Sequence, residues 1–486
     1  MSYRIEGTAS EIGEVLNMAY ELLNKITYVV DKNNMDDVYA VYELEDGTRR
    51  VDKLFSNDFQ SVIRNYLREE KEIVKVPSLK PLLNAIADKR LEYEAVELHT
   101  RFAGDDDMYE YFFADENKKC IQIRANKVKF TKTPKYYFLQ KRNTLPQTIP
   151  KKTDVGLYDL LRKYINLNDD DYKLFLTYLC QLFMYNTAHM ICIISSEHGS
   201  GKSTFTRIIR RLVDPTRAEN ALVPKSIDDL LNHCANNNVV CFDNTKCLSN
   251  DESDVLCAAV TGATLPKRTL YTTSEETLLF LKNIVIINGI NIIPKKSDFI
   301  ERSLLFELQK MTTDKRKSEN EFFSEFDKDK PFIMYRIFTT VSEAMKVKET
   351  LKLDKSHRMY DAFFDMCAIA VALGFDLEEY QEIFFENNKK LELAYAENNS
   401  FVNAIVDYMQ FVMNDRVFSA TMTQAYRIIG KYYDGSDFPK SASAFSRKLH
   451  EEESAIREMG YHCVTKLRKD ATHLTISKAV RTVSKK

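Results

Sequence analysis

One stretch of the sequence carries the residue types of a phosphate-binding loop. It reads Ser196-Glu-His-Gly-Ser-Gly-Lys-Ser-Thr204 and follows the apolar run Ile191-Cys-Ile-Ile194. The apolar run predicts a buried strand, the Gly/Ser segment a tight loop, and residues 204–212 the first turns of a helix. In such a loop the backbone amides and the helix N-terminus point at phosphate oxygens, a lysine reaches the β- and γ-phosphates, and a hydroxyl binds Mg²⁺. We therefore predict a nucleotide-binding site formed by Gly199, Ser200, Gly201, Lys202, Ser203 and Thr204.

This loop departs from the G-x-x-x-x-G-K-[ST] pattern at one position, because Ser196 stands where the pattern opens with glycine. The alternative interpretation is a chance Gly-Lys-Ser in a surface loop. The strand before the loop and the helix after it favour the nucleotide site.

Three polar residues adjoin later apolar runs. Val239-Val-Cys-Phe-Asp243 predicts a second buried strand that ends in a carboxylate, and Ile284-Val-Ile-Ile-Asn-Gly289 predicts a third that ends in Asn288. An aspartate at the carboxyl end of a neighbouring strand is the usual metal-side partner of a phosphate loop. Asn288 can polarise the attacking water and sense the γ-phosphate, although a turn-forming Asn-Gly is the competing account. Arg302 directly precedes a further apolar run.

Five motifs in this region carry a family resemblance. They are Gly199-Ser-Gly-Lys-Ser-Thr204, Phe242-Asp-Asn244, Thr261-Gly-Ala with Arg268-Thr-Leu-Tyr271, Ile287-Asn-Gly-Ile290 and Glu301-Arg-Ser303. Their order and spacing resemble AAA+ ATPases of the superfamily three helicase type that phages and mobile islands encode. The resemblance is strongest to the self-loading replication-initiator helicases of staphylococcal and related islands. Residues 155–310 carry it, and the flanking regions share only the architecture.

The resemblance implies a ring, expected to be a hexamer, with ATP between protomers. Lys202 and Ser203 would bind phosphate and Mg²⁺, Asp243 would hold the metal and water, and Asn288 would be the sensor. Arg302 would be the finger that a neighbouring protomer donates. Asn244 departs from the Asp-Glu pair of many AAA+ proteins, which leaves the general base unassigned because an amide cannot accept the proton. Residues 262–282 would form a hairpin that reaches single-stranded DNA in the central channel, with these residues nearest the DNA: Lys267, Arg268 and Lys282.

The whole chain gives bounds on these expectations. Its 486 residues suggest several domains. Its net charge of −2 does not indicate a partner, so any surface that binds nucleic acid must be a local basic patch. Nine cysteines without a C-x-x-C pair indicate a reducing, cytoplasmic setting and not a disulfide or zinc framework. The chain opens without a basic-then-apolar signal segment. Residues 174–194 are its most apolar window, and the polar side chains within them favour a core helix and strand over a membrane span.

Before the nucleotide site we expect two units. Residues 1–95 predict a mostly helical domain with helices over 10–28, 58–70 and 78–93, and a hairpin around Asp46-Gly47. Residues 96–150 predict a small β element and a proline-marked linker. Four lysines alternate with apolar residues in this element, so its basic face could contact a nucleic-acid backbone or could simply be solvated; they are Lys127, Lys129, Lys132 and Lys135.

The expected fold is an α/β ATPase core over residues 151–312, with a parallel sheet and helices on both faces. A helical lid follows over 313–396, with helices over 331–348, 357–373 and 378–397. Residues 397–486 predict a winged-helix domain of three helices, over 401–412, 421–433 and 441–460, and a two-stranded wing. From residue 440 to the end the chain has 11 Lys and Arg against 5 Asp and Glu, a local net charge of +6. We expect this domain to bind duplex origin DNA through these residues, although protein contacts are the alternative: Arg447, Lys448, Lys466, Arg468 and Lys469.

Two function classes follow from the sequence. The first is an ATP-driven DNA helicase and replication initiator of a mobile genetic element, which binds origin DNA and unwinds it. The second is a nucleotide-dependent switch or defence NTPase that separates no strands. Both need ATP and Mg²⁺, and neither needs a membrane.

Overall fold

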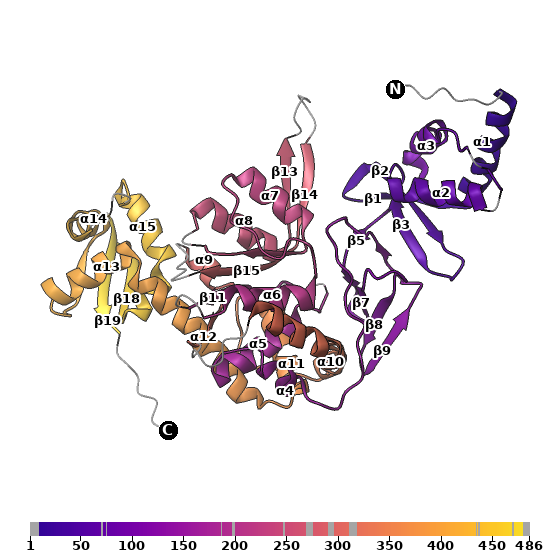
Figure 1. Ribbon diagram of the computed structural model, residues 1–486. Helices are drawn as coiled ribbons and strands as arrows, with labels where there is room; N and C mark the ends of the chain where they lie inside the picture. The colour runs from indigo at the N-terminus through magenta and orange to yellow at the C-terminus, as the bar shows by residue number, and fades with distance from the viewer. Residues whose placement is uncertain are drawn as a thin grey trace.

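The computed structural model describes most of the chain (Figure 1). The described residues are 9–69, 71–73, 75–185, 187–196, 200–245, 248–268, 276–289, 296–310, 318–433, 435, 438–468 and 471–479. Within these ranges no helix has both the length and the apolar character needed to cross a membrane. The apolar window at 174–194 instead divides into the end of one buried helix and the start of one buried strand, as predicted.

The N-terminal unit is a mixed sheet with helices. Its strands run in the order β3-β2-β1-β4, with the bounds β1 Thr27–Asp31, β2 Asn34–Glu43, β3 Arg49–Lys53 and β4 Glu94–Val96. Its helices are α1 Ala9–Leu23, α2 Asn57–Glu69, α3 Lys80–Ala87 and the 3₁₀ turn η1 Arg90–Glu92. The prediction of a mostly helical domain was thus incomplete. The hairpin is confirmed as β2–β3. However, β1 begins inside the helix predicted over 10–28, and β4, which pairs with β1 in parallel, spans the predicted boundary at residue 95.

The predicted small β element is confirmed as an antiparallel sheet in the order β6-β7-β8-β9. Its strands are β6 Phe102–Gly104, β7 Tyr109–Phe112, β8 Cys120–Arg124 and β9 Lys127–Thr131; two shorter strands, β5 Leu98–His99 and β10 Tyr137–Phe138, pair beside it. Arg101 ties this element to the next domain. Its fully buried guanidinium donates to Asp214 at 3.0 Å and to three backbone carbonyls.

The centre of the molecule is a four-stranded parallel sheet in the order β12-β15-β11-β16. The strands are β11 Ile191–Ser195, β12 Val239–Phe242, β15 Ile284–Gly289 and β16 Ser303–Glu307. The helices around it are α4 Leu157–Arg162, α5 Asp169–Gln181, α6 Lys202–Val213, α7 Ile227–Asn236, α8 Asn250–Thr261 and α9 Ser297–Ile300. Because all four strands are parallel, their carboxyl ends share one edge, where ligands bind in such sheets.

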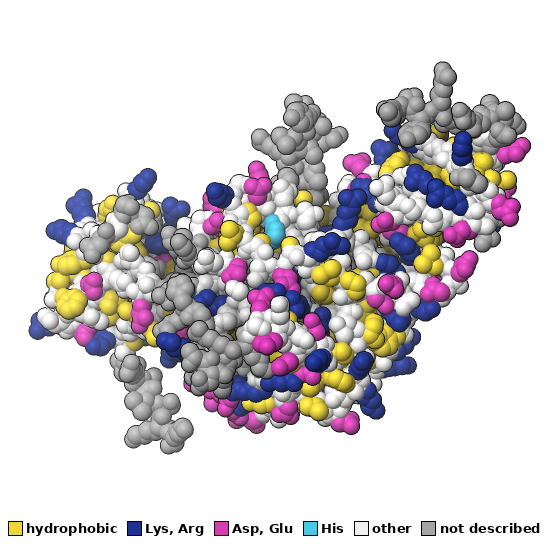
Figure 2. All heavy atoms as spheres, in the orientation of Figure 1, with side chains coloured by type: hydrophobic (Ala, Val, Ile, Leu, Met, Phe, Trp, Pro, Cys, Tyr) yellow, Lys and Arg dark blue, Asp and Glu magenta, His cyan; other side chains and the backbone are white. Residues whose placement is uncertain are grey.

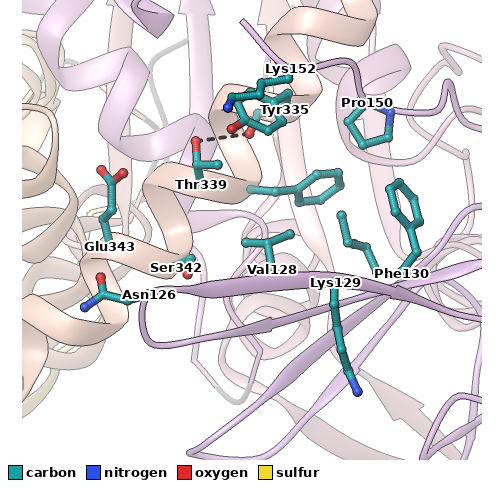
Figure 3. Close-up of a pocket in the computed structure, with 12 residues that line it drawn as sticks. Asn126, Val128, Lys129, Phe130, Pro150, Lys152, Tyr335, Thr339, Ser342 and Glu343 are labelled. Carbon is teal, nitrogen blue, oxygen red and sulfur yellow. Dashed lines mark hydrogen bonds between the residues drawn. The ribbon is translucent and has the colours of Figure 1, made fainter. Parts of the chain in front are cut away.

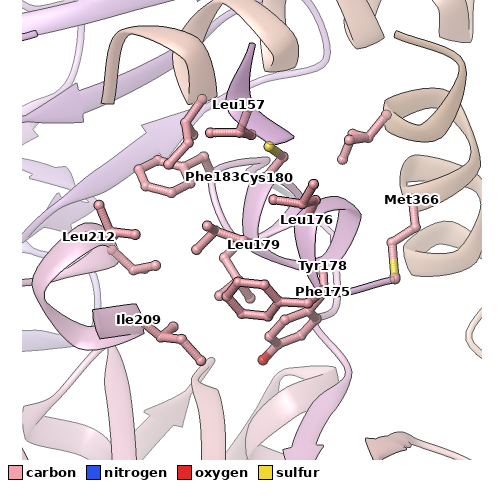
Figure 4. Close-up of a cluster of buried hydrophobic side chains, with 14 of the residues drawn as sticks. Leu157, Phe175, Leu176, Tyr178, Leu179, Cys180, Phe183, Ile209, Leu212 and Met366 are labelled. Carbon is pink, nitrogen blue, oxygen red and sulfur yellow. The ribbon is translucent and has the colours of Figure 1, made fainter. Parts of the chain in front are cut away.

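Both faces of this sheet are covered, as expected for an α/β core. Alternate residues of β11 belong to different cores: Cys192 and Ile194 pack with α5 and α6, whereas Ile191 and Ile193 pack with α8 and the C-terminal unit. Figure 4 shows the first of these cores, with α5 side chains such as Phe175 and Leu179 gathered near those of α6 and α11. Two-sided burial explains the continuous apolar runs of these strands.

A hairpin rises from the core beside α7 and α8 (Figure 1). Its strands are β13 Ala263–Arg268 and β14 Glu276–Leu281, paired antiparallel from Ala263↔Leu281 to Arg268↔Glu276. This confirms the expected hairpin within residues 262–282. Residues 269–275 lie outside the described part of the chain.

Three long helices follow the core: α10 Glu319–Lys348, α11 Tyr360–Ala372 and α12 Leu377–Glu397. The first begins well before the predicted start at residue 331. Ser318 and Glu321 form a capping box there, and Pro331 lies inside the helix. Phe323 and Phe326 are buried, so apolar packing holds the segment before the proline in the helix.

The C-terminal unit lies at the opposite end of the molecule from the N-terminal unit (Figure 1). Its helical elements are α13 Ser400–Asp407, the π turn η3 Tyr408–Val412, α14 Met422–Ile429, the 3₁₀ turn η4 Gly430–Tyr432, α15 Ala442–Glu451 and α16 Glu453–Glu458. Its strands are β17 Phe418–Thr421, β18 Tyr461–Arg468 and β19 Ala471–Lys478, in the order β17-β19-β18. Two predictions are corrected here. The two strands predicted as a wing, β18 and β19, belong to a three-stranded sheet with β17, and the helix expected over 441–460 is two helices that meet at Glu452.

Candidate nucleotide site and nucleic-acid surfaces

The predicted phosphate loop joins the carboxyl end of β11 to the start of α6. Gly201 caps the helix with a φ of 90°, a left-handed conformation that favours glycine, and Lys202 and Ser203 open the first turn. Thr204 follows in the same turn. The first amides of a helix have no carbonyl partner within the helix, and here this end of α6 lies at the sheet edge where ligands bind. Gly199 lies outside the described residues.

Ser196, the departure from the loop pattern, takes part in holding the loop. Its hydroxyl contacts that of Ser200, and its carbonyl oxygen accepts a hydrogen bond from the Lys202 ammonium at 2.7 Å. Burial lowers the pKa of Lys202, and the nearby Asp243 carboxylate partly opposes that shift. Ser196 thus holds the Lys202 side chain beside the start of the loop.

Asp243 lies where the sequence predicted it, directly after β12 and against the phosphate loop. The Ser203 hydroxyl donates to its Oδ1 at 3.3 Å, and the Asn220 amide donates to its Oδ2 at 3.4 Å. Sequence analysis missed Asn220. Only the bridge between Ala221 and Phe242, which aligns two segments distant in sequence, brings it to the site.

The residues around Asp243 fit a small, hard cation. A hydroxyl and a carboxylate supply oxygen ligands, the kind that Mg²⁺ prefers. Two further oxygens near Asp243, Asn220 Oδ1 and Thr245 Oγ1, are buried without a hydrogen-bond partner, so polar groups remain to be satisfied there. Among the described residues no group of three His, Cys, Asp or Glu side chains gathers around a metal position. Ser203 and Asp243 are therefore the residues that would hold Mg²⁺, with substrate phosphates as its further ligands.

Asn288 links the loop helix to the segment after Asp243. It is fully buried; its Nδ2 donates to Thr206 Oγ1 at 2.9 Å, and its Oδ1 accepts from the Asn244 backbone amide at 3.0 Å. Asn244 itself has a φ of 54°, and its side chain is exposed. Asn288 therefore connects the helix after the phosphate loop to the segment that follows Asp243.

Arg302 lies at the opposite sheet edge from Lys202. It directly precedes β16, whereas Lys202 follows the carboxyl end of the neighbouring parallel strand β11. The Arg302 guanidinium forms an ion pair with Asp298, and Asp298 also pairs with Arg358. Although burial raises the pKa of Asp298, the two guanidiniums hold it below its usual value. Arg302 thus cannot reach the loop of its own chain, and it has a structural partner.

The hairpin residues expected to contact DNA occupy different positions. Lys267 and Arg268 lie on the outer half of β13, beside residues 269–275. Their side chains are outside the described part of the structure. Lys282 instead lies at the base of the hairpin, where its ammonium is 4.6 Å from the centre of the Tyr185 ring. Burial lowers its pKa, with Glu97 opposing the shift.

The basic residues of the C-terminal unit also separate into two kinds. Arg447, Lys466 and Arg468 are exposed, and Figure 2 shows Lys and Arg side chains over the outer end of this unit. Lys448 forms an ion pair at 2.6 Å with Glu452, which is almost fully buried and accepts from the Tyr395 hydroxyl of α12. Lys448 therefore also has a structural partner at the contact with α12. Lys469 is outside the described residues.

Comparison with known proteins gives one family match. Residues 159–382 match the family described as the actinomycete integrative conjugative element replication protein. The resemblance to replication proteins of mobile elements is confirmed over these residues. The match covers most of the α/β core and continues through α10 and α11 into α12.

Solved structures give weaker likenesses. A structure titled "SCCmec type IV Cch - active helicase" is 11% identical, with 93% of each chain covered and a TM-score of 0.47. The NrS-1 C-terminal region in its apo form is 13% identical, with 96% of this chain and 99% of that chain covered and a TM-score of 0.42. At these scores neither neighbour decides what this chain does. No curated protein matches it.

Proposed function

We propose that the protein is an ATP-dependent DNA helicase and replication initiator of a mobile genetic element. The observation that carries the proposal is the convergence of Lys202, Ser203, Asp243 and Asn288 at one sheet edge. The family match over residues 159–382 supports the replication role.

Each residue of the site has a distinct part in phosphoryl transfer. The Lys202 ammonium, held by Ser196 in the structure described here, turns to the β- and γ-phosphates of ATP. Ser203 and Asp243 would hold Mg²⁺, and the bound metal would supply positive charge beside the phosphates. Asn288 holds the backbone after Asp243 in place relative to α6, so a movement of α6 moves that backbone and the reverse. Asn220 orients the Asp243 carboxylate through its amide.

A neighbouring protomer completes this site in the proposed assembly. Arg302 lies at the opposite sheet edge from the chain's own loop, so it can serve only the nucleotide of another chain. A closed ring satisfies this geometry for every protomer, and a hexamer is the ring we propose. The β13–β14 hairpin, which rises away from the sheet, then lines a central channel for single-stranded DNA (Figure 1).

The C-terminal unit is proposed to bind duplex origin DNA as a winged helix. Its chain order supports this assignment, because the helices α13, α14, α15 and α16, with β17 after α13, precede the β18–β19 hairpin. Ser441 caps α15, whose exposed Arg447 can reach a DNA groove, and Lys466 and Arg468 lie on one face of the wing.

Two measurements test the proposal. Lys202→Ala and Asp243→Ala should each abolish ATP hydrolysis, because they remove a phosphate contact and a metal ligand; near-normal turnover in either variant contradicts the nucleotide site. Strand separation on a forked DNA substrate then distinguishes a helicase from an ATP-dependent switch. A protein whose ATPase activity responds to DNA but which separates no strands would be the switch.

The origin-binding step has its own test. Joint neutralisation of Lys466, Arg468 and Lys469 should reduce the salt slope of duplex binding by about 0.9 for each lost phosphate contact. An unchanged slope would show that the wing does not contact DNA.

A further inference from the structure

The β8–β9 hairpin presents a cationic surface that the proposed ATPase does not use. Its register pairs Gln122 with Lys129 and Arg124 with Lys127, so all four side chains lie on one face of the sheet. They line a hollow of about 340 Å³. Figure 2 shows Lys and Arg side chains along the flank where β8 and β9 lie in Figure 1.

The charges of this face are not balanced by neighbouring carboxylates. Lys132 and Lys135, the other two lysines of the basic stretch, pair with Asp46 and Asp105. Within the described residues, none of the three cations on the hairpin face has an ion-pair partner. These cations are Arg124, Lys127 and Lys129.

Glu110, a carboxylate on the same face as Gln122, is already occupied by hydrogen bonds. Glu110 pairs in register with Gln122, is buried, and accepts from the Gln122 amide at 2.6 Å. It also accepts from the backbone amides of Lys135 and Tyr136. Arg124 and Lys127 are paired directly across the two strands. Like charges at such a position destabilise the strand pair. An anion from outside the chain would remove that repulsion.

The opposite face of the same strand has a complementary chemistry. A hollow of about 500 Å³ lies between β9 and α10, lined by apolar and aromatic side chains that include Phe130, Tyr335 and Phe338. Phe130 is 47% exposed. Figure 3 shows Phe130 and Lys129 leaving the strand in opposite directions, with the aromatic ring on the side of Tyr335. Asn126, Ser342 and Glu343 supply polar groups at the rim.

We propose that the edge strand β9 is a binding site for single-stranded DNA, separate from the channel hairpin and from the C-terminal unit. The phosphodiester backbone lies on Arg124, Lys127 and Lys129, and a base enters the aromatic hollow beside Phe130. β9 is at the open edge of its sheet, so one strand can run along it with phosphates toward one face and bases toward the other. Duplex DNA keeps its bases paired and cannot fill the second hollow.

This inference rests on the proposed function, because it adds a contact for the same DNA substrate. Its test is the salt dependence of binding to a labelled 20-nucleotide oligo-dT, measured by fluorescence anisotropy with an ATP analogue. Replacing Arg124, Lys127 and Lys129 together by serine should lower the salt slope by about 2, because each lost contact to a single-strand phosphate contributes about 0.7. A control triple replaces Lys80, Lys328 and Lys352, which are exposed and change the net charge equally; it should leave the slope almost unchanged.

The aromatic hollow is tested separately with Phe130→Leu, which keeps an apolar side chain against Phe113. Loss of one base stack should reduce affinity for oligo-dT by about tenfold and leave affinity for an abasic strand unchanged.

Each other outcome overturns the inference in a recognisable way. A wild-type protein that binds no DNA refutes the proposed function and this site together. Wild-type binding with an unchanged slope in the Arg124, Lys127 and Lys129 variant refutes this site alone. If that variant fails to assemble but keeps its slope, the face is a contact between protomers. If it weakens duplex binding equally and Phe130→Leu has no effect, the face binds duplex DNA.

Discussion

Arg302 provides the sharpest test of the ring, because the structure supports two different roles for it. As a finger, it offsets charge on the γ-phosphate of a neighbouring protomer. As a structural residue, it neutralises Asp298, to which it is paired. Replacing Arg302 by alanine removes both contributions, and their expected sizes differ enough to separate them.

The structural contribution is small, because Asp298 keeps a second partner. Arg358 pairs with the same carboxylate and with Glu301, so the Asp298 charge stays compensated after the substitution. The side chains of Arg302 and Asp298 are 16% and 40% exposed, and solvent at the carboxylate screens such a pair to about 1 kcal/mol. Loss of a finger instead reduces the hydrolysis rate on the order of 10³ to 10⁵ in other phosphoryl-transfer systems.

The assay compares Arg302→Ala with Arg358→Ala as a matched control. Both variants remove one guanidinium from Asp298, so thermal unfolding should change little in both. Nucleotide binding, followed with a fluorescent ATP analogue, should be retained in both. Only Arg302→Ala should lose hydrolysis.

Mixing determines whether the arginine acts between protomers. The Lys202→Ala protomer keeps Arg302, and the Arg302→Ala protomer keeps the phosphate loop. In a mixed ring, some interfaces therefore combine an intact Arg302 from one protomer with an intact phosphate loop from its neighbour. ATPase activity should therefore reappear on mixing. The assignment in trans is wrong if mixed rings form without restored activity, and the finger role is wrong if both guanidinium variants hydrolyse ATP equally well.

Three further predictions concern other parts of the fold. Arg101→Met should destabilise the protein by about 3–5 kcal/mol in urea unfolding, because it leaves Asp214 buried without its guanidinium; a loss below about 1 kcal/mol would contradict this role. Burial lowers the pKa of His189 to about 3, whereas an exposed histidine titrates near about 6.5. The unfolded chain therefore takes up this proton first, and stability falls as the pH decreases from about 6.5 toward 3, by at most about 1.4 kcal/mol per pH unit. His189→Gln should flatten that part of the profile, and an unchanged profile would exclude His189 as its source. Asn220→Ala should lower kcat for ATP about tenfold with nucleotide affinity retained, because one hydrogen bond to Asp243 is lost; an unchanged kcat would refute this positioning role.

The elements of the core were predictable because their patterns are local. Each buried strand is a short apolar run, and β11 leads directly into the Gly-Lys-Ser turn that opens α6. A parallel sheet covered on both faces requires such runs. The positions of Lys202, Ser203, Asp243 and Asn288 at strand ends followed from the same patterns, since polar residues that end parallel strands meet at one edge.

Segments that depend on distant partners were not predictable in this way. The first two residues of β1, Thr27 and Tyr28, fall within the helix predicted over 10–28, and only the pairing of β1 with β2 and β4 defines it as a strand. β17 has four residues and becomes a strand by pairing with β19, more than fifty residues later in the chain. Short strands gain their stability from such pairing and not from their own sequence.

The sequence alone determined which residues can perform chemistry; the tertiary structure decided which of them have other partners. Lys448 and Arg302 are cations in the sequence like many others, yet one is paired with the buried Glu452 and the other with Asp298. Among the residues that the structure describes, Lys132 is paired and Lys127 has no ion-pair partner, although both belong to one basic stretch. The physical reason is that an ion pair needs two charges within about 4 Å, and the chain segments that meet at that distance are set by the packing of the whole fold.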